Sequence, residues 1–383
     1  MGPLEGYKIV EIAGIGPGQF CGMLLADMGA RLIRIDNPAG GDRGVAMPAQ
    51  YNLMNRSRPV IGVDLKEPEG VDLVLRLCAG ADALFEGFRP GVMERLGLGP
   101  ADCMARNPRL VYGRITGWGQ EGPLADTAGH DTNYIALAGA LGTLGEAQRP
   151  PPVPLNLIGD FGGGGLYLAL GMLAALLEAH RSGQGQVVDA AMVDGTASMM
   201  TLFYGMLAGG LWQDRRGVNL FDGSAPFVRT YETRDGEYVA VCAIEGRFFA
   251  ALLEALETDE IDPKDQYDRA SWPEHHAVLE RLFRSRTRDE WTQAFDGIDA
   301  CFAPVLSLME AAAHPHSEAR NSYLTVDAVL QPAPAPRFSR TPSQIQCAPS
   351  EPGGNAGDSL AGWGLSDAEI ERLHRQGIVN VRP

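Results

Sequence analysis

The chain has 383 residues, of which 45% are hydrophobic and 21% charged, and its formal net charge is -16. This composition indicates a soluble globular protein with two domains, and the acidity argues against nucleic acid, because a duplex-binding protein needs a basic face to displace counterions. The six cysteines are dispersed without a Cys-x-x-Cys pattern, so we expect neither a zinc site nor a disulfide framework, and a reducing compartment fits best.

The first part of the chain predicts a parallel sheet. Short apolar runs alternate with turns and helices, which is typical of α/β folds. The predicted strands are Lys8–Ile12, Arg31–Ile35, Val60–Asp64, Ala83–Glu86 and Leu110–Ile115, with helices over Phe20–Met28 and Val71–Leu77. We therefore expect residues 1–190 to form the N-terminal part of a large α/β domain.

The turn at Gly14–Gly18 also suggests a dinucleotide site, because a glycine-rich first turn followed by an acidic residue such as Asp36 is the pattern that binds NAD. The match is poor. The third glycine, Gly18, comes one position early, and Pro17 lacks the backbone N–H that a pyrophosphate needs there. A dehydrogenase is therefore disfavoured.

The middle of the chain predicts a crossover between domains over residues 191–226 and a smaller α+β domain over residues 227–320. Strands over 228–232 and 238–241 alternate as a hairpin around Asp235-Gly236. Further predicted elements are helices over 166–180, 190–207, 246–256, 276–283 and 288–295, and a strand over 186–189.

The last part, residues 321–383, includes a proline- and glycine-rich stretch over 331–364 that we expect to be extended. A final helix is predicted to begin at a capping box formed by Ser366 and Glu369 and to end at Gly377. The apolar run Leu166–Leu177 is too short to span a bilayer. No signal peptide is indicated.

Two motifs carry candidate chemistry. The first is Gly129-His130-Asp131-Thr132-Asn133-Tyr134, and the second is Asn156-Leu157-Ile158-Gly159-Asp160-Phe161 followed by four glycines. They place an imidazole and a carboxylate on separate glycine-flanked loops. A reaction in which a proton leaves one face of a carbon and returns to the other needs two such bases. The segment Gly159–Gly165 could also supply backbone N–H groups to a developing oxyanion. The alternative is that His130 caps a loop and Asp160 caps a helix starting near Gly162.

These motifs occur in order with several others. The others are Gly14-Ile15-Gly16-Pro17-Gly18, Glu86-Gly87-Phe88-Arg89-Pro90-Gly91, Thr116-Gly117-Trp118-Gly119-Gln120, Gly185-Gln186-Val187-Val188-Asp189-Ala190-Ala191-Met192 and Ala335-Pro336-Arg337-Phe338-Ser339. Each motif alone is weak evidence for a family. With all of them in this order and at this spacing, the chain resembles the alpha-methylacyl-CoA racemases, within the superfamily of family III (formyl-CoA type) CoA-transferases.

The resemblance implies a Rossmann-like large domain built from both chain termini, a small middle domain, and an interlocked homodimer. It implies a racemase that interconverts (R)- and (S)-2-methylacyl-CoA thioesters by 1,1-proton transfer through an enolate. CoA is part of the substrate, so neither a separate cofactor nor a metal is expected. Because the chain ends without a peroxisomal tripeptide, we expect a cytoplasmic enzyme that does not insert into membranes. The preferred acyl group and the pathway stay open.

The resemblance also implies roles for single residues. His130 would take the proton on the (S) face and Asp160 the proton on the (R) face, with Glu245 holding the imidazole. If so, deuterium incorporation into one enantiomer should be lost selectively in His130→Ala and in Asp160→Ala. Contacts to the CoA moiety or thioester are implied for Asn37, Val63, Asp64, Leu65, Lys66, Gly87, Phe88, Arg89, Arg95, Gly129, Asp131, Thr132, Asn133 and Tyr134. Asn37 departs from the family, in which an arginine can occupy that position. A phosphate contact is then either lost or taken over by Arg34 or Arg43.

Two other functions stay open. A family III CoA-transferase would use Asp160 as a nucleophile that forms a mixed anhydride, with no need for an opposed base. A non-catalytic CoA-binding protein would explain the N-terminal arginines but not two unlike bases. The combination of His130, Asp160 and Glu245 favours the racemase.

Overall fold

The computed structural model describes residues 2–38, 45, 47–353 and 356–380. The chain forms two compact units. Unit 1 comprises Met1–Ala138, Pro154–Met199 and Ala319–Pro383, and unit 2 comprises Gly139–Val153 and Met200–Glu318. The domain ranges expected from the sequence stay a prediction.

Unit 1 contains a seven-stranded sheet among its described residues, in the order β12-β3-β2-β1-β4-β5-β6. The strands are β1 (Lys8–Ile12), β2 (Arg31–Asp36), β3 (Val60–Val63), β4 (Ala83–Glu86), β5 (Val111–Thr116), β6 (Val187–Ala191) and β12 (Val379–Asn380). The first six are parallel, and only β12 runs antiparallel, to β3. Their order, 3-2-1-4-5-6, is that of doubly wound folds. The predicted α/β class with a Rossmann-like sheet is confirmed.

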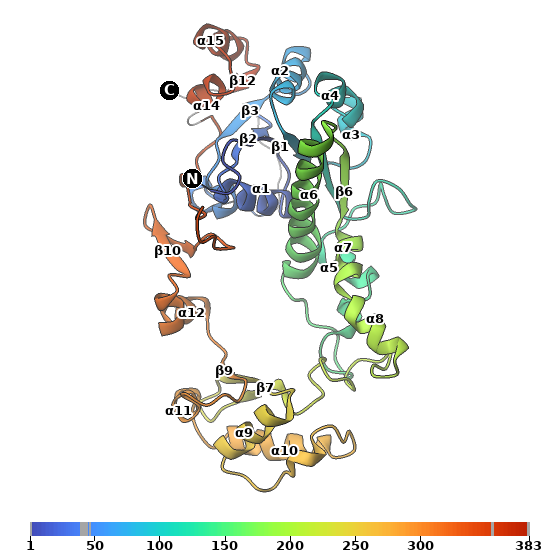
Figure 1. Cartoon of the computed structure of the whole chain (residues 1–383), viewed down its shortest axis with the longest axis vertical. Coiled ribbons are helices and arrows are strands. Elements are labelled where there is room, and N and C mark those ends of the chain that lie inside the picture. The colour runs from blue at the N-terminus through green and yellow to red at the C-terminus, as the bar shows by residue number, and fades with distance from the viewer. Residues whose placement is uncertain (1, 39–44, 46, 354–355, 381–383) are drawn as a thin grey trace. The chain divides into compact units, whose positions relative to one another are not determined.

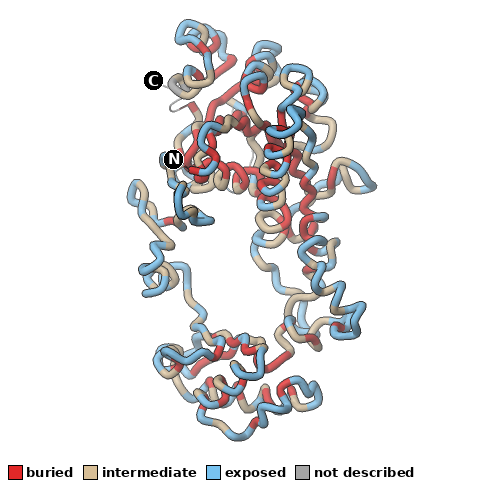
Figure 2. Tube along the Cα trace, in the orientation of Figure 1, coloured by how far each residue is buried: buried red, intermediate tan, exposed pale blue. Residues whose placement is uncertain are grey.

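Both faces of this sheet are covered (Figures 1 and 2), as parallel sheets require. Successive residues of a strand point to opposite faces. Accordingly, Val10 belongs to a buried cluster with residues from the helices over 68–79, 356–361 and 367–375, whereas its neighbour Ile9 belongs to a cluster with residues from the helices over 17–27 and 167–182. The helices of unit 1 are α1 (Pro17–Asp27), α2 (Pro68–Ala79), α3 (Val92–Arg95), α4 (Pro100–Arg106), α5 (Asp131–Leu137), α6 (Tyr167–Ser182), α7 (Met192–Met199), α14 (Ala356–Ala361) and α15 (Asp367–Arg375).

The glycine run differs from the sequence expectation. It was predicted as a loop, but Leu157–Leu166 forms a π-helical segment, η4, that continues directly into α6. Tertiary packing explains this. A Cβ atom at Gly163 would lie 2.7 Å from the backbone nitrogen of Thr196 in α7, and one at Gly165 would lie 2.7 Å from the carbonyl oxygen of Pro17 in α1. Only glycines allow these backbones to approach so closely.

The continuous helix Leu157–Ser182 is, in the described part of the chain, the one segment long and apolar enough to cross a membrane by length and composition. The sequence expectation that this run is too short therefore needs correction. In the fold the helix packs against β5, β6, α1 and α7, and Leu168 and Met172 are fully buried there. One face of the helix is therefore buried in unit 1, whereas Leu170 and Leu177 on the same helix are exposed.

Unit 2 contains a three-stranded antiparallel sheet in the order β7-β8-β9, which confirms a smaller α+β unit. Its strands are β7 (Val228–Glu232), β8 (Tyr238–Cys242) and β9 (Phe302–Pro304), and its helices are α8 (Thr201–Ala208), α9 (Gly246–Ala255), α10 (Trp272–Phe283), α11 (Arg288–Ala294), α12 (Leu308–Ala313) and α13 (Pro315–Ala319). The β7–β8 hairpin has the predicted turn, and Thr230 lies opposite Ala240. The single helix predicted over 190–207 is instead two, α7 and α8, which are separated at Met200 and belong to different units.

The C-terminal segment of the chain packs on unit 1. Arg56 donates to the side chain of Gln331 and to the carbonyl of Pro332 while it pairs with Asp27, and Ser57 N–H donates to the carbonyl of Cys347. The hairpin β10 (Tyr323–Val326) and β11 (Val329–Pro332) precedes nearly all of the stretch 331–364 that was expected to be extended, and within that stretch α14 is helical. The capping of α15 by Ser366 is as predicted.

Candidate active site

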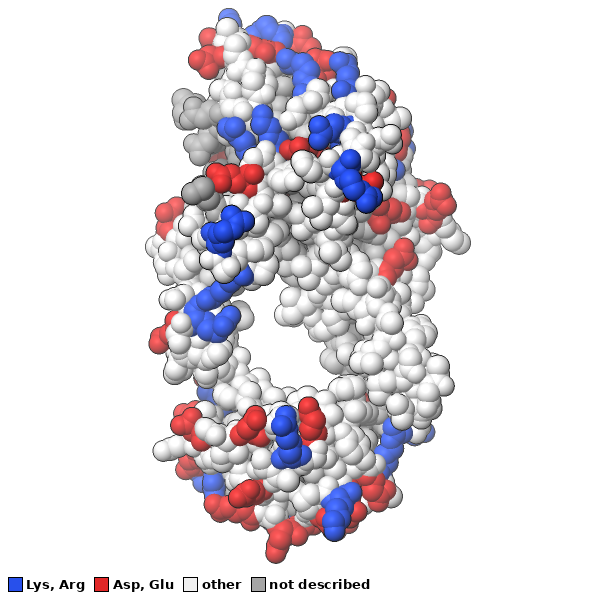
Figure 3. Space-filling model, in the orientation of Figure 1, with Lys and Arg blue, Asp and Glu red and all other residues white. Residues whose placement is uncertain are grey.

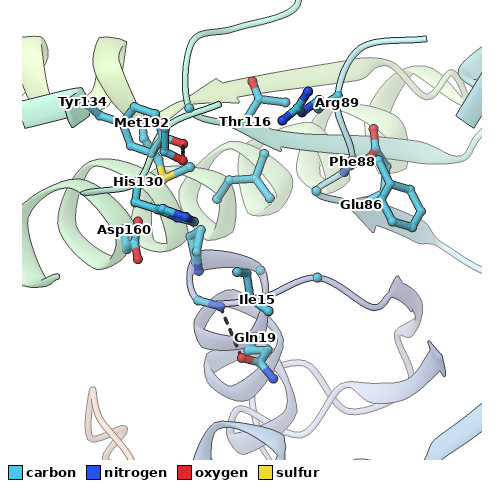
Figure 4. A pocket seen from close by; sticks show the side chains of 18 of the residues that line it. Ile15, Gln19, Glu86, Phe88, Arg89, Thr116, His130, Tyr134, Asp160 and Met192 are labelled. Carbon is cyan, nitrogen blue, oxygen red and sulfur yellow. Dashed lines mark hydrogen bonds between the residues drawn. The ribbon is translucent and has the colours of Figure 1, made fainter. Parts of the chain in front are cut away.

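A cavity of about 750 Å³ lies in unit 1 at the carboxyl ends of β1, β4 and β5. In a doubly wound sheet the strand order reverses between β1 and β4, and ligands bind in the crevice at that point. The volume lies in the range of small-molecule sites, about 300–1,000 Å³. Its lining comes mainly from the segments 14–19, 85–90, 115–118 and 127–130, together with Tyr134, Asn156, Asp160 and Met192. Figure 4 shows this lining.

His130 reaches the cavity from the N-terminus of α5. It is the residue before the helix, and its backbone N–H donates to Oδ1 of Asn133 at 3.0 Å. Trp118 and Tyr134 pack edge to face beside it, with ring centroids 4.8 Å apart, and the Tyr134 hydroxyl donates to the carbonyl of Gly129. A Cβ at Gly129 would lie 2.8 Å from the Tyr134 ring. The glycine and the two aromatic rings therefore fix the segment that carries the exposed imidazole.

Asp160 reaches the same cavity from the first turn of η4. The carboxyl is half-buried, and its Oδ2 accepts from Nδ2 of Asn156 at 3.2 Å. Burial raises the pKa of Asp160, the negative charge of Asp131 raises it further, and the Asn156 bond and His130 lower it. A Cβ at Gly16 would lie 3.1 Å from Oδ2, so glycine lets the loop after β1 approach this carboxyl. The two predicted bases thus line one cavity (Figure 4).

Asp131 lies behind the cavity wall. Its side chain is 4% exposed, and Oδ2 accepts the backbone N–H groups of Gly159 at 2.7 Å and Asp160 at 2.8 Å. These two N–H groups were expected to be available to an oxyanion. Since both donate to Asp131, that part of the glycine segment is not a free donor pair.

Glu245, the expected partner of His130, is the residue before α9 in unit 2. Its side chain is exposed, and burial together with the charge of Glu245 raises the pKa of Tyr267. His130 belongs to unit 1, so the hydrogen bond between Glu245 and the imidazole stays a prediction.

The predicted CoA contacts fall into two groups. Gly87, Phe88, Arg89, Gly129 and Tyr134 line the cavity. The others do not line it: Asn37, Val63, Asp64, Leu65, Lys66, Arg95, Asp131, Thr132 and Asn133. Asn37 nevertheless follows β2, Val63 is the last residue of β3, and Asp64–Lys66 follow it at the carboxyl edge of the sheet. Their contacts to CoA stay predictions.

Arg34 and Arg43 were the two residues suggested to make the phosphate contact in place of Asn37. Arg34 is fully buried, where it pairs with Glu11 and donates to the carbonyl of Gly14. It therefore holds the loop after β1 and has no exposed nitrogen for a phosphate, so that suggestion is wrong. Arg43 lies outside the described residues.

Sequence reasoning missed Glu86, the last residue of β4, which lines the cavity although it is only 3% exposed. It accepts the backbone N–H of Phe88 at 2.7 Å and faces the guanidinium of Arg114 at 3.5 Å. Arg114 also donates to Glu94 and Gln120. Burial raises the pKa of Glu86 to about 7, against the opposing effects of Phe88 N–H and Arg114. An acidic residue ending an apolar strand was the available signal.

This raised pKa predicts a pH-dependent stability. Between pH 4.5 and about 7 the folded chain keeps the Glu86 proton that the unfolded chain has lost, so the free energy of unfolding falls as pH rises through this window. Glu86→Gln should remove this pH-dependent loss of unfolding free energy. The loss is on the order of 3 kcal/mol at most, because one pKa unit corresponds to about 1.4 kcal/mol. Denaturant unfolding at pH 5, 6, 7 and 8 measures it, with exposed Glu121→Gln as control. Equal pH slopes for Glu86→Gln and the unsubstituted chain would contradict the assignment.

Among the described residues no group of three or more His, Cys, Asp or Glu side chains is arranged to hold a metal ion. The absence of a separate cofactor stays a prediction.

Comparisons with known proteins agree with the motifs. Residues 4–356 match the model of CoA-transferase family III. The chain is 44% identical over 379 residues to an alpha-methylacyl-CoA racemase of Mus musculus, covering 98% of this chain and 97% of the relative. It is 41% identical to that of Homo sapiens, with coverage of 98% and 97%. A CAIB/BAIF family protein from Brucella suis is similar in structure, with a TM-score of 0.79, 26% identity and coverage of 94% and 99%.

Proposed function

This chain belongs to CoA-transferase family III, and we propose that within this family it is an alpha-methylacyl-CoA racemase. It interconverts (R)- and (S)-2-methylacyl-CoA thioesters by removing the α-proton with one base and returning a proton from the other. The observation that carries the proposal is that His130 and Asp160 line one cavity at the switch point of the sheet. The full-length similarity to two racemases supports it.

The chemistry explains why the two groups matter. An α-proton whose pKa lies about ten units above that of its base costs on the order of 14 kcal/mol to remove. A raised pKa makes the Asp160 carboxylate a stronger base and narrows this gap. His130, already at the cavity, supplies the second group. The (S) face is assigned to His130 and the (R) face to Asp160, with a planar enolate between them.

A CoA-transferase that uses Asp160 as nucleophile is the alternative, and one experiment separates the two. Purified protein is incubated in heavy water with (R)- or (S)-2-methylacyl-CoA, with and without a free carboxylic acid. The racemase should place deuterium on the α-carbon of both enantiomers and leave CoA on its original acyl group. Transfer of CoA to the free acid without α-deuteration would establish the transferase instead.

Homodimer formation, with two chains interlocked, is part of the proposal. Exposed apolar side chains support it, because large exposed apolar surfaces mark association sites. Leu170 and Leu177 on α6 are 65% and 71% exposed, and Leu202 on α8 is 58% exposed. Figure 3 shows few charges over α8 in this view. Light scattering should give twice the chain mass, and a monomer would contradict it. We also propose a cytoplasmic enzyme without a membrane-inserted segment.

A further inference from the structure

The two loops that carry the candidate bases are joined by one buried carboxylate. Asp131 follows His130 directly and is the first residue of α5. Its Oδ2 accepts the N–H of Gly159 at 2.7 Å and that of Asp160 itself at 2.8 Å. A single side chain next to one base therefore holds the main chain of the other, although 29 residues separate Asp131 from Asp160 in the sequence.

The residues around Gly159 allow this contact and strengthen it. A Cβ at Gly159 would lie 2.8 Å from Oδ2 of Asp131 and 3.1 Å from Cγ2 of Ile135, so glycine is needed for the carboxylate to approach. The two N–H groups belong to the first turn of η4, where a negative charge is favoured by the helix dipole. Bonds from N–H groups to an ionised acceptor are also stronger than neutral ones. The contact is thus short, buried and charge-assisted.

We infer that Asp131 is a positioning residue that holds Asp160 in register with His130 across the cavity. This inference rests on the proposed function and deepens it. Asp131 was expected to contact the substrate directly. Its carboxylate is instead buried and accepts hydrogen bonds from the backbone N–H groups of Gly159 and Asp160. A misplacement of a catalytic group by about 1 Å costs on the order of 100-fold in rate. Loss of the hydrogen bonds from Asp131 should therefore slow proton transfer at Asp160.

Asp131 has a second effect, through charge. Its carboxylate disfavours a second negative charge on Asp160, whereas His130 favours one. Tyr134 also feels both carboxylates and the opposing charge of Arg89, and burial with these charges raises the pKa of Tyr134 to about 12. Tyr134 therefore stays neutral at neutral pH, and the charged neighbours that set the basicity of Asp160 are Asp131 and His130.

Two substitutions separate position from charge. Asp131→Ala removes both acceptor oxygens, whereas Asp131→Asn keeps an oxygen that can accept the two N–H groups but removes the charge. Asp222→Asn is the matched control, because Asp222 is also buried and accepts the N–H groups of Gly217, Val218 and Asn219 at 2.8, 3.1 and 3.0 Å but does not line the cavity.

The main readout is α-deuterium exchange from each enantiomer in heavy water. In Asp131→Ala we expect kcat for the (R) substrate, whose proton faces Asp160, to fall about 100-fold. The (S) exchange at His130 should fall less than about tenfold, and KM should stay within about threefold, because the cavity lining is retained. Asp131→Asn should keep most of the (R) rate and shift the rise of its pH profile to lower pH, since the charge that raises the Asp160 pKa is gone. Asp222→Asn should leave rates and profile unchanged.

Equal losses for both enantiomers in Asp131→Ala, or a pH profile unmoved in Asp131→Asn, would overturn the inference. Amide hydrogen exchange gives a test that does not require activity. In Asp131→Ala the N–H groups of Gly159 and Asp160 should lose protection relative to the unsubstituted chain, and unchanged protection would overturn the inference. Absence of α-exchange in the unsubstituted chain would instead overturn the proposed function, so the two failures are distinguishable.

Discussion

Asp160→Asn is expected to lower kcat for α-proton exchange from the (R) enantiomer by about 10³-fold or more, because positioned acid–base groups contribute about 10²–10⁴-fold. The substitution keeps the size of the side chain, and the amide can still interact with Asn156, but an amide does not accept a proton at neutral pH. The pKa of Asp160 is raised by burial and by Asp131, so the lost group is a stronger base than an ordinary aspartate. Steady-state kinetics with each enantiomer in heavy water measures the effect.

A matched control for Asp160→Asn is Asp194→Asn. Asp194 is an exposed carboxylate in α7 and does not line the cavity. The Asp194→Asn substitution should leave kcat unchanged. Exchange from the (S) enantiomer should survive Asp160→Asn to within about tenfold, because His130 remains in place. An undiminished (R) exchange in Asp160→Asn would remove Asp160 from the mechanism.

His130→Gln is expected to have an effect of similar size on the other enantiomer, about 10²–10⁴-fold on kcat for (S) exchange. Glutamine fills much of the same space on the segment fixed by Trp118 and Tyr134, but it neither accepts nor donates a proton in the way an imidazole does. His180→Gln, at an exposed position in the last turn of α6, is the control and should change nothing.

The same variant separates the two candidate functions. A CoA-transferase that relies on Asp160 as nucleophile needs no opposed base, so it would keep its activity in His130→Gln. Retained turnover of acyl-CoA in this variant, with CoA appearing on a free acid, would favour the transferase. Loss of (S) exchange with (R) exchange retained would favour the racemase.

Much of unit 1 could be predicted from sequence because most residues of its first five strands are buried. The apolar runs at Lys8–Ile12 and Ala83–Glu86 are strands with the predicted bounds. A strand that is covered on both faces has apolar side chains at nearly every position, so it can be recognised as a short apolar run. The hairpin of unit 2 was equally predictable, because Asp235-Gly236 marks its turn. In the same way, the motifs led to His130 and Asp160, and both line the cavity.

The remainder depends on distant contacts that local patterns do not contain. Four consecutive glycines predict a loop, yet η4 is helical, and α7 and α1 pack against it too closely for a Cβ atom at Gly163 or Gly165. The hydrogen bonds of Asp131 were missed because its partners lie 28 and 29 residues away, and the resemblance implied a substrate contact for Asp131 instead. Similarly, nothing in the strand over 83–86 shows that Glu86 will meet Arg114 at the cavity.

The most direct test of the central claim, that His130 and Asp160 act on opposite faces of one α-carbon, is α-deuterium exchange without inversion in the two single-base variants. Each variant is incubated with each pure enantiomer in heavy water, and both deuterium content and configuration are measured. We predict that His130→Gln exchanges the (R) enantiomer and Asp160→Asn the (S) enantiomer, each with retention of configuration and almost no racemisation. Loss of exchange from both enantiomers to the same extent in both variants would contradict two bases on opposite faces.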